Sequence, residues 1–143
     1  LPVFRWITIS RLSSRFLAGC CAMRFSGNSN LMITNLIGSH NTSVSTLTGN
    51  NNQITEVVNT SNGTVNNTVS GDENIFNIQQ TDAAGVSGHL LVMNTNGNYN
   101  SITTQQQGNN NTDVNLTITG TNNTTTIRTS STTIVNPMTA VAR

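Results

Sequence analysis

Apolar and polar residues alternate with a period of two along much of the chain. From Gly97 to Asn111 the sequence GNYNSITTQQQGNNN contains a four-residue turn, Gly-x-x-Asn, then seven residues, and then the same turn again. Within those seven residues Ile102, Thr104 and Gln106 share one face, which is the periodicity of a β-strand. Glycine supplies the unusual dihedral angles of a tight corner, and asparagine tolerates them. The stretch therefore predicts a unit of turn, strand and turn.

This unit recurs at a nearly constant spacing. Gly-x-x-Asn turns begin at positions 27, 49, 71, 97 and 120, so that their starts are separated by 22, 22, 26 and 23 residues. A second, looser set of turns lies midway between them, which gives two strands and two turns per period. The predicted structural turn residues are Gly27, Asn30, Gly49, Asn52, Gly71, Asn74, Gly97, Asn100, Gly108, Asn111, Gly120 and Asn123.

The phase of the strands predicts an inward face. Counted from the asparagine that closes each turn, apolar side chains mostly share one face, with threonine, asparagine or glutamine between them. Glu56 falls on this face as well, and residues 31–37 are apolar on both faces, so their phase is undecided. The predicted core consists of Ile54, Val58, Val65, Val69, Phe76, Ile78, Gln80, Leu91, Met93, Ile102, Gln106, Val114, Leu116, Ile118 and Ile127.

Two short strands per period cannot bury a face alone, whereas coils stacked about 4.8 Å apart can. The sequence therefore predicts an all-β fold, a two-sided parallel β-solenoid of about five coils of ~22 residues each. The expected organisation is a targeting segment or cap at 1–26, the five-repeat solenoid at 27–136 and a C-terminal tail at 137–143. The asparagines that close the major turns are expected to stack as a hydrogen-bonded ladder of Asn30, Asn52, Asn74, Asn100 and Asn123.

The first 26 residues differ from the rest of the chain. They contain arginine, serine and apolar residues but no acidic residue, which is typical of an export or targeting segment. The string LAGC, which ends at Cys20, also resembles the lipobox of bacterial lipoproteins, although Arg11 and Arg15 interrupt its apolar run. An irregular cap is the alternative, so cleavage and lipidation stay open. No stretch reaches the ~20 apolar residues of a membrane-spanning helix.

Charge and cysteine content exclude several functions. From residue 27 to residue 136 there is one arginine, Arg128, against five acidic residues, a net charge of −4, which argues against a nucleic-acid-binding surface. Cys20 and Cys21 are adjacent and are the only cysteines, so neither a disulfide framework nor a zinc site is predicted.

No catalytic, cofactor or metal site is predicted. His40 and His89 are expected to be solvated turn residues, because neither has a second ligand nearby in sequence. Asp72 and Glu73 are adjacent carboxylates in one corner, which suits either calcium or a solvated polar corner. Without a placed histidine no catalytic triad can be assembled, so the sequence argues against an enzyme.

A family resemblance extends over about residues 27–130. The repeat and the strings SGDENIFNIQQTDAAG, QQQGNNNTDVNL and TGTNNTTTIRTS resemble the curlin subunits of bacterial curli fibres. Curlin units place one glutamine two residues before the turn glycine and another six residues after the turn asparagine. Gln106 matches both positions and Gln80 matches the second, whereas other repeats depart from the pattern, as in a distant member of the family.

The resemblance implies a secreted bacterial protein of the extracellular matrix or cell surface that forms a functional amyloid. Its partners would be further copies of itself, a nucleator subunit and a secretion channel. Open solenoid edges also favour self-association, because lysine is absent and the only prolines are Pro2 and Pro137. The threonine rows 117–119 and 124–126 leave an ice-binding solenoid as an alternative, and a β-helical segment of an adhesin or phage fibre is another. The polar composition alone would favour disorder.

Overall fold

The computed structural model describes residues 7–13, 20–82, 88–108, 112–131 and 135–142. Within these ranges every regular element is a β-strand and none is a helix. The strands are β1 (Ile7–Ser13), β2 (Cys20–Ser26), β3 (Leu31–Ile37), β4 (Thr42–Thr48), β5 (Gln53–Asn59), β6 (Thr64–Ser70), β7 (Ile75–Asp82), β8 (Leu90–Asn96), β9 (Ser101–Gly108), β10 (Thr112–Thr119), β11 (Thr124–Ser131) and β12 (Val135–Ala142).

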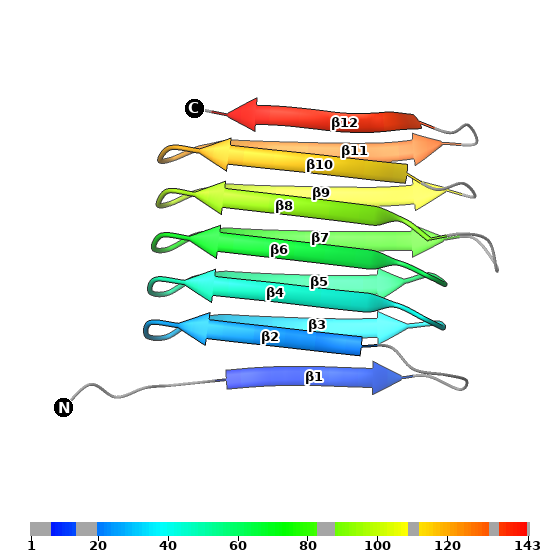
Figure 1. Cartoon of the computed structure of the whole chain (residues 1–143), viewed down its shortest axis with the longest axis horizontal. Coiled ribbons are helices and arrows are strands. Elements are labelled where there is room, and N and C mark those ends of the chain that lie inside the picture. The colour runs from blue at the N-terminus through cyan, green and yellow to red at the C-terminus, as the bar shows by residue number, and fades with distance from the viewer. Residues whose placement is uncertain (1–6, 14–19, 83–87, 109–111, 132–134, 143) are drawn as a thin grey trace.

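Successive strands alternate between two parallel sheets. The odd-numbered strands form one six-stranded sheet in the order β1-β3-β5-β7-β9-β11, and the even-numbered strands form the other in the order β12-β10-β8-β6-β4-β2. Each pair of strands makes one coil, and the coils stack from β1 to β12 (Figure 1). Between β3 and β5 the register runs from Leu31 opposite Gln53 to Ile37 opposite Asn59, a shift of one ~22-residue period. The predicted all-β parallel solenoid is confirmed.

Both terminal parts of the chain contribute strands. Within the segment 1–26, β1 pairs with β3 and β2 pairs with β4, so these strands add a coil before the first predicted repeat. β12 pairs with β10 and includes residues 137–142 of the predicted tail. Most of the LAGC string lies outside the described residues, and whether the segment 1–26 is cleaved or lipidated stays a prediction.

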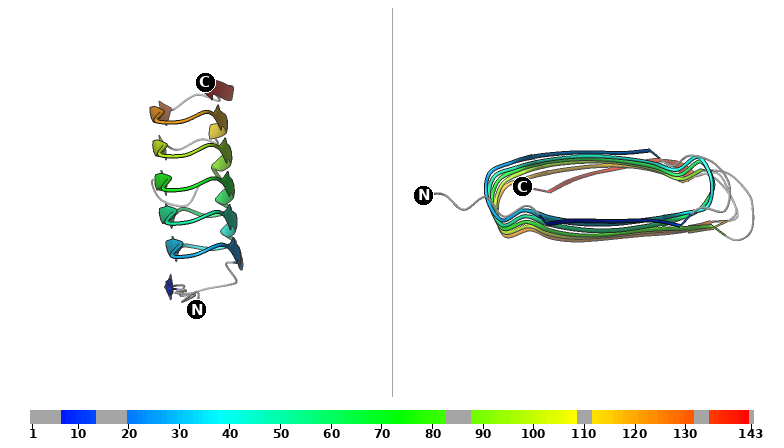
Figure 2. Two further views of the ribbon diagram at one scale, coloured as in Figure 1. Left: turned by 90° about the vertical axis from the view of Figure 1, so that its left-hand side faces the viewer. Right: turned by 90° about the horizontal axis from the view of Figure 1, so that it is seen from below.

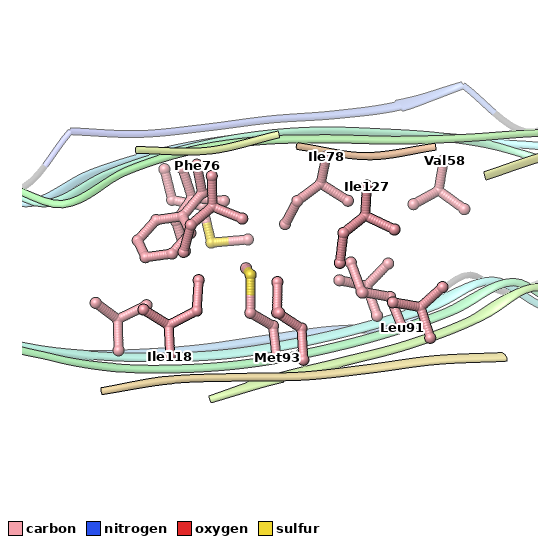
Figure 3. Close-up of a cluster of buried hydrophobic side chains, with 14 of the residues drawn as sticks. Val58, Phe76, Ile78, Leu91, Met93, Ile118 and Ile127 are labelled. Carbon is pink, nitrogen blue, oxygen red and sulfur yellow. The ribbon is translucent and has the colours of Figure 1, made fainter. Parts of the chain in front are cut away.

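The core is the thin layer between the two sheets. Seen along the solenoid axis, each coil is a flattened loop whose long sides face each other (Figure 2). Phe76 and Ile78 project from the odd-numbered sheet toward Met93 and Ile118 of the even-numbered sheet (Figure 3). Every member of the predicted core is buried, and the undecided segment 31–37 turns its alternate residues inward as Met32, Thr34 and Leu36.

The major corners need two residues in the left-handed region. Each of the five major Gly-x-x-Asn turns, which start at 27, 49, 71, 97 and 120, places its glycine and its third residue at positive φ, as in Gly97 (φ 146°) and Tyr99 (φ 57°). The corners also stack tightly, since a Cβ atom added at Gly97 would overlap the carbonyl oxygen of Gly120 in the next coil. The predicted turn residue Gly108 has positive φ as well, whereas Asn111 lies outside the described residues.

Candidate functional site

The most distinctive surfaces of the molecule are its two ends. At one end the sheets stop at β1 and β2, and at the other end they stop at β11 and β12 (Figure 1). Each of these strands pairs with one neighbour in its sheet, and its other side has no strand partner among the described residues. An unpaired strand edge is a template for pairing with another chain. The two ends are therefore the candidate functional site.

The hydrogen-bonding groups on the β11 edge follow from the pairing of that strand. The backbone N–H of Ser101 donates to the carbonyl oxygen of Asn123 at 2.8 Å, and Ser101 lies opposite Thr124. In a parallel pair the groups of alternate residues face the same neighbour. Asn123 and every second residue after it therefore face β9. The N–H and C=O groups of Thr124, Thr126, Arg128 and Ser130 point away from β9, toward the open side of the sheet.

Two features distinguish the edge strands at the ends of the solenoid from the strands inside it. Pro137, which has no backbone N–H, lies in β12, and the pairing of β12 with β10 shifts register between Thr112 and Val114. Arg128 of β11 lies at one end of a register column whose other end is Arg11 of β1. This column runs from Arg11 through Asn35, Val57, Gln79 and Gln105 to Arg128.

The predicted asparagine ladder runs along one side of the solenoid. The side-chain oxygen of Asn52 accepts from both the backbone N–H and the side-chain amide of Asn74, at 3.0 Å and 2.9 Å. The same amide of Asn74 also donates to the carbonyl oxygen of Gly97 at 2.8 Å, which ties the corner of the next coil. This pattern repeats at each step of the ladder, which consists of Asn30, Asn52, Asn74, Asn100 and Asn123.

A second corner ladder was missed by the sequence reasoning. The Asp72 carboxylate accepts from the backbone N–H and the side-chain amide of Asn50, at 2.6 Å and 3.1 Å. The backbone N–H of Asp72 donates in turn to the side-chain oxygen of Asn98, and that of Asn28 donates to Asn50. The sequence could have predicted this ladder, because Asn28, Asn50, Asp72 and Asn98 each directly follow the glycine of a major turn. Asp72 thus takes part in coil stacking.

The two glutamines that fit the curlin pattern meet inside the solenoid. The Gln80 side-chain amide donates to the Gln106 side-chain oxygen at 2.8 Å, and the Gln106 amide donates to the carbonyl oxygen of Thr112 at 2.8 Å. His89 joins this cluster through its Nδ1, which lies 2.9 Å from the Thr112 hydroxyl. The prediction that His89 is solvated was wrong, because the ring packs inward just before β8 and is 1% exposed. His40 is exposed in its turn, as expected.

Glu56 is the one acidic side chain that the structure shows buried in the core. Its side chain is 0% exposed, and one carboxylate oxygen accepts a hydrogen bond of 3.0 Å from the hydroxyl of Ser43. The other oxygen has no hydrogen-bond partner among the described residues. Burial raises the pKa of Glu56 to about 7, and the bond from Ser43 acts in the opposite direction because it favours the charged form. Sequence phase alone places this acid inside.

An open cleft of about 570 Å³ lies on the odd-numbered sheet, near the major corners. Tyr99 and Ile75, both exposed, line it together with Glu73 and Gln53. The described residues contain no cluster of three histidine, cysteine or acidic side chains that would hold a metal ion.

Cys20 and Cys21 are free and exposed on the edge strand β2. Burial raises the pKa of the Cys21 thiol, and the nearby charges of Glu56 and Cys20 raise it further. Both thiols therefore belong to one of the candidate ends.

Nowhere in the described ranges is there a helix long and apolar enough to cross a membrane.

Comparisons with protein-family models, curated proteins and solved structures found no match for this chain. The resemblance to curlin subunits therefore rests on the spacing of the turns and on the three strings of sequence. The fold rests on the strand pairing itself.

Proposed function

We propose that this protein is a structural subunit that polymerises head to tail into a curlin-like extracellular fibre. The observation that carries the proposal is that two parallel sheets of six strands each stop at unpaired strands at both ends of the molecule. The surface that one coil offers to the next inside the chain is the same kind of surface that each end offers to another copy. The proposed function requires no enzyme chemistry, cofactor or nucleic-acid-binding surface.

In such a joint, β1 of one copy adds to β11 of another, and β2 adds to β12. The internal coils supply the template, since pairs such as β5 with β7 keep one register over their whole length. Adding a copy satisfies the outward N–H and C=O groups of β11, which otherwise bond only to water. Self-association therefore continues the pattern that already stabilises the fold.

The biological setting comes from the resemblance to curlin subunits. It supports secretion by a bacterium, a place in the extracellular matrix or on the cell surface, and polymerisation aided by a nucleator subunit and a secretion channel. The polar ladders of asparagine and glutamine support polymerisation into an amyloid, because stacked amides are a common stabilising feature of amyloid sheets.

A substitution on the open side of β11 tests the proposal. The backbone N–H of Thr126 points away from β9, so Thr126→Pro removes one donor from the edge without breaking a hydrogen bond within the sheet. We expect the variant to keep the far-ultraviolet circular dichroism of a β-protein but to lose most seeded fibre elongation, followed by thioflavin T. Thr126→Val is the matched control, because it keeps the N–H and should elongate normally.

The outcome distinguishes the alternatives. Equal elongation of both variants would show that this edge does not form the joint. A wild-type protein that stays a soluble monomer at high concentration and shows thermal hysteresis would identify an ice-binding solenoid instead. Fibres with a meridional reflection near 4.8 Å are expected for the proposed polymer.

A further inference from the structure

The side chains that fill the inside of the solenoid change from apolar to polar along its axis. Around Ile78 and Met93 the lumen is apolar, whereas one step toward β1 it holds a compact group of polar side chains. Figure 3 shows how the apolar part is filled by facing side chains from both sheets. The polar group, here called the lumen cluster, consists of Thr34, Ser43, Ser45, Glu56 and Asn67, all at most 2% exposed.

The lumen cluster contains polar atoms that form no hydrogen bond with the described residues. Ser43 donates to one oxygen of Glu56, and the Asn67 amide donates to the Ser45 hydroxyl at 3.2 Å. Three atoms have no hydrogen-bond partner within the described part of the chain: the second oxygen of Glu56, the side-chain oxygen of Asn67 and the hydroxyl oxygen of Thr34. An ionised carboxylate can only accept hydrogen bonds, whereas a protonated one can also donate one. A neutral Glu56 therefore suits these surroundings better than a charged one.

Among the side chains that the structure describes, no positive charge compensates a charged Glu56. Glu56 lies between Thr34 of β3 and Ile78 of β7 in its own sheet. The inward residues of β4 and β6 are serine, asparagine and apolar side chains, and β2 adds the thiol of Cys21. Cys21 is thus the only titratable side chain facing Glu56 among the described residues of these strands, and a thiolate there would repel the carboxylate. Burying an unpaired carboxylate is costly.

We propose that the solenoid folds with Glu56 protonated, so that folding takes up a proton near neutral pH and is favoured by mild acid. This inference concerns the folding of the chain. It extends to fibre assembly only if the proposed function holds, because only a folded coil offers an ordered, unpaired strand edge to another copy.

The sign and size of the effect follow from proton linkage. The pKa of Glu56 rises from an ordinary 4.5 to about 7 on folding, so the folded chain binds more protons than the unfolded chain between these values. Stability therefore falls as the pH rises through this window and levels off above about pH 7. Linkage with these two values lowers the folding equilibrium constant about 40-fold between pH 5 and pH 7.

The test compares the full-length wild type with Glu56→Gln, which keeps the shape of the side chain but cannot ionise. Glu73→Gln is the matched control, since Glu73 is an exposed corner residue. Guanidinium unfolding of the unassembled chain is followed by circular dichroism at pH 5, 6, 7 and 8 and constant ionic strength. We expect the wild type and Glu73→Gln to lose stability from pH 5 to pH 7, and Glu56→Gln to lose much less.

A second variant separates protonation from packing. The titration of Glu56 can be followed by the ¹³C nuclear magnetic resonance signal of its carboxyl carbon. Because the hydrogen bond from Ser43 favours the charged form, Ser43→Ala should raise the pH midpoint of this titration. A midpoint near 7 in the wild type supports the proposal, and one near 4.5 overturns it.

Two further results would also overturn the proposal. One is the same pH profile for the wild type and Glu56→Gln. The other is recovery of wild-type stability at pH 8 by calcium, which would mean that a cation neutralises the cluster. If the pH profile behaves as expected but no fibres form at any pH, the proposed function fails while the assignment to Glu56 stands. If fibres form, their critical concentration should rise with pH in the wild type and stay nearly constant in Glu56→Gln.

Discussion

The asparagine ladder gives the sharpest stability prediction, at its central member Asn74. The Asn74 side chain is fully buried and connects three coils. Its oxygen accepts from the backbone N–H and the side-chain amide of Asn100, both at 3.0 Å, and its own amide donates to Asn52 and Gly97. Truncation in Asn74→Ala removes all four of these bonds at once.

The cost follows from which groups are left without a partner. The Asn100 side-chain amide keeps its bond to the carbonyl oxygen of Gly120, and Asn52 keeps the backbone N–H of residue 74. The Asn100 backbone N–H loses its acceptor, and the Gly97 carbonyl loses the Asn74 amide. Each buried group left unpaired costs about 1–3 kcal/mol, so Asn74→Ala should lower the free energy of unfolding by about 4 kcal/mol.

The last member of the ladder is the matched control. Asn123 donates to Asn100 through both its backbone N–H and its side-chain amide, so Asn123→Ala leaves Asn100 with one of its two donors. We expect a loss of about 1 kcal/mol, the net value of one hydrogen bond. Guanidinium unfolding of the unassembled chains at one pH measures both losses. If Asn74→Ala costs no more than Asn123→Ala, the ladder does not stabilise the stacking of coils.

Two further substitutions test the corners and the joint. Gly97→Ala should lower the free energy of unfolding by about 2 kcal/mol or more, because its methyl group meets the Gly120 carbonyl at a positive φ. The exposed neighbour variant Asn96→Ala should stay within about 0.5 kcal/mol of the wild type in the same unfolding assay, and an equal loss in both would contradict the reasoning. An in-register joint places Arg128 of one copy beside Arg11 of the next, so like charges should slow elongation at low salt. Raising the ionic strength from about 0.01 M to about 0.15 M should speed wild-type elongation, and Arg128→Gln should be faster at low salt and less salt-dependent; thioflavin T kinetics would refute this if both proteins respond alike.

The fold was predictable because one repeated signal carries it. The nearly constant distance between Gly-x-x-Asn turns sets the length of a coil, and the alternation from Ile102 to Gln106 indicates which face turns inward. Stacking identical turns then requires the ladder through Asn52 and Asn74, whatever the residues between them.

The other features of the structure depend on contacts that the repeat pattern does not specify. The strands β1 and β2 lie in a segment without Gly-x-x-Asn turns before residue 27, so only their pairing with β3 and β4 reveals them. His89 was misplaced because it belongs to the looser set of turns, whose length varies, and its bond to Thr112 spans two coils. The phase of Glu56 was read correctly, but its hydrogen bond to Ser43 comes from the opposite sheet.

The mass per unit length of the fibre tests the central claim most directly. If copies of this 15.3-kDa chain stack end to end, each occupies six strand spacings, about 29 Å along the axis. Dark-field electron microscopy of unstained single filaments should then give roughly 0.5 kDa per Å. A value near 3 kDa per Å would mean one chain per ~4.8 Å layer, which would contradict the stacking of intact solenoids.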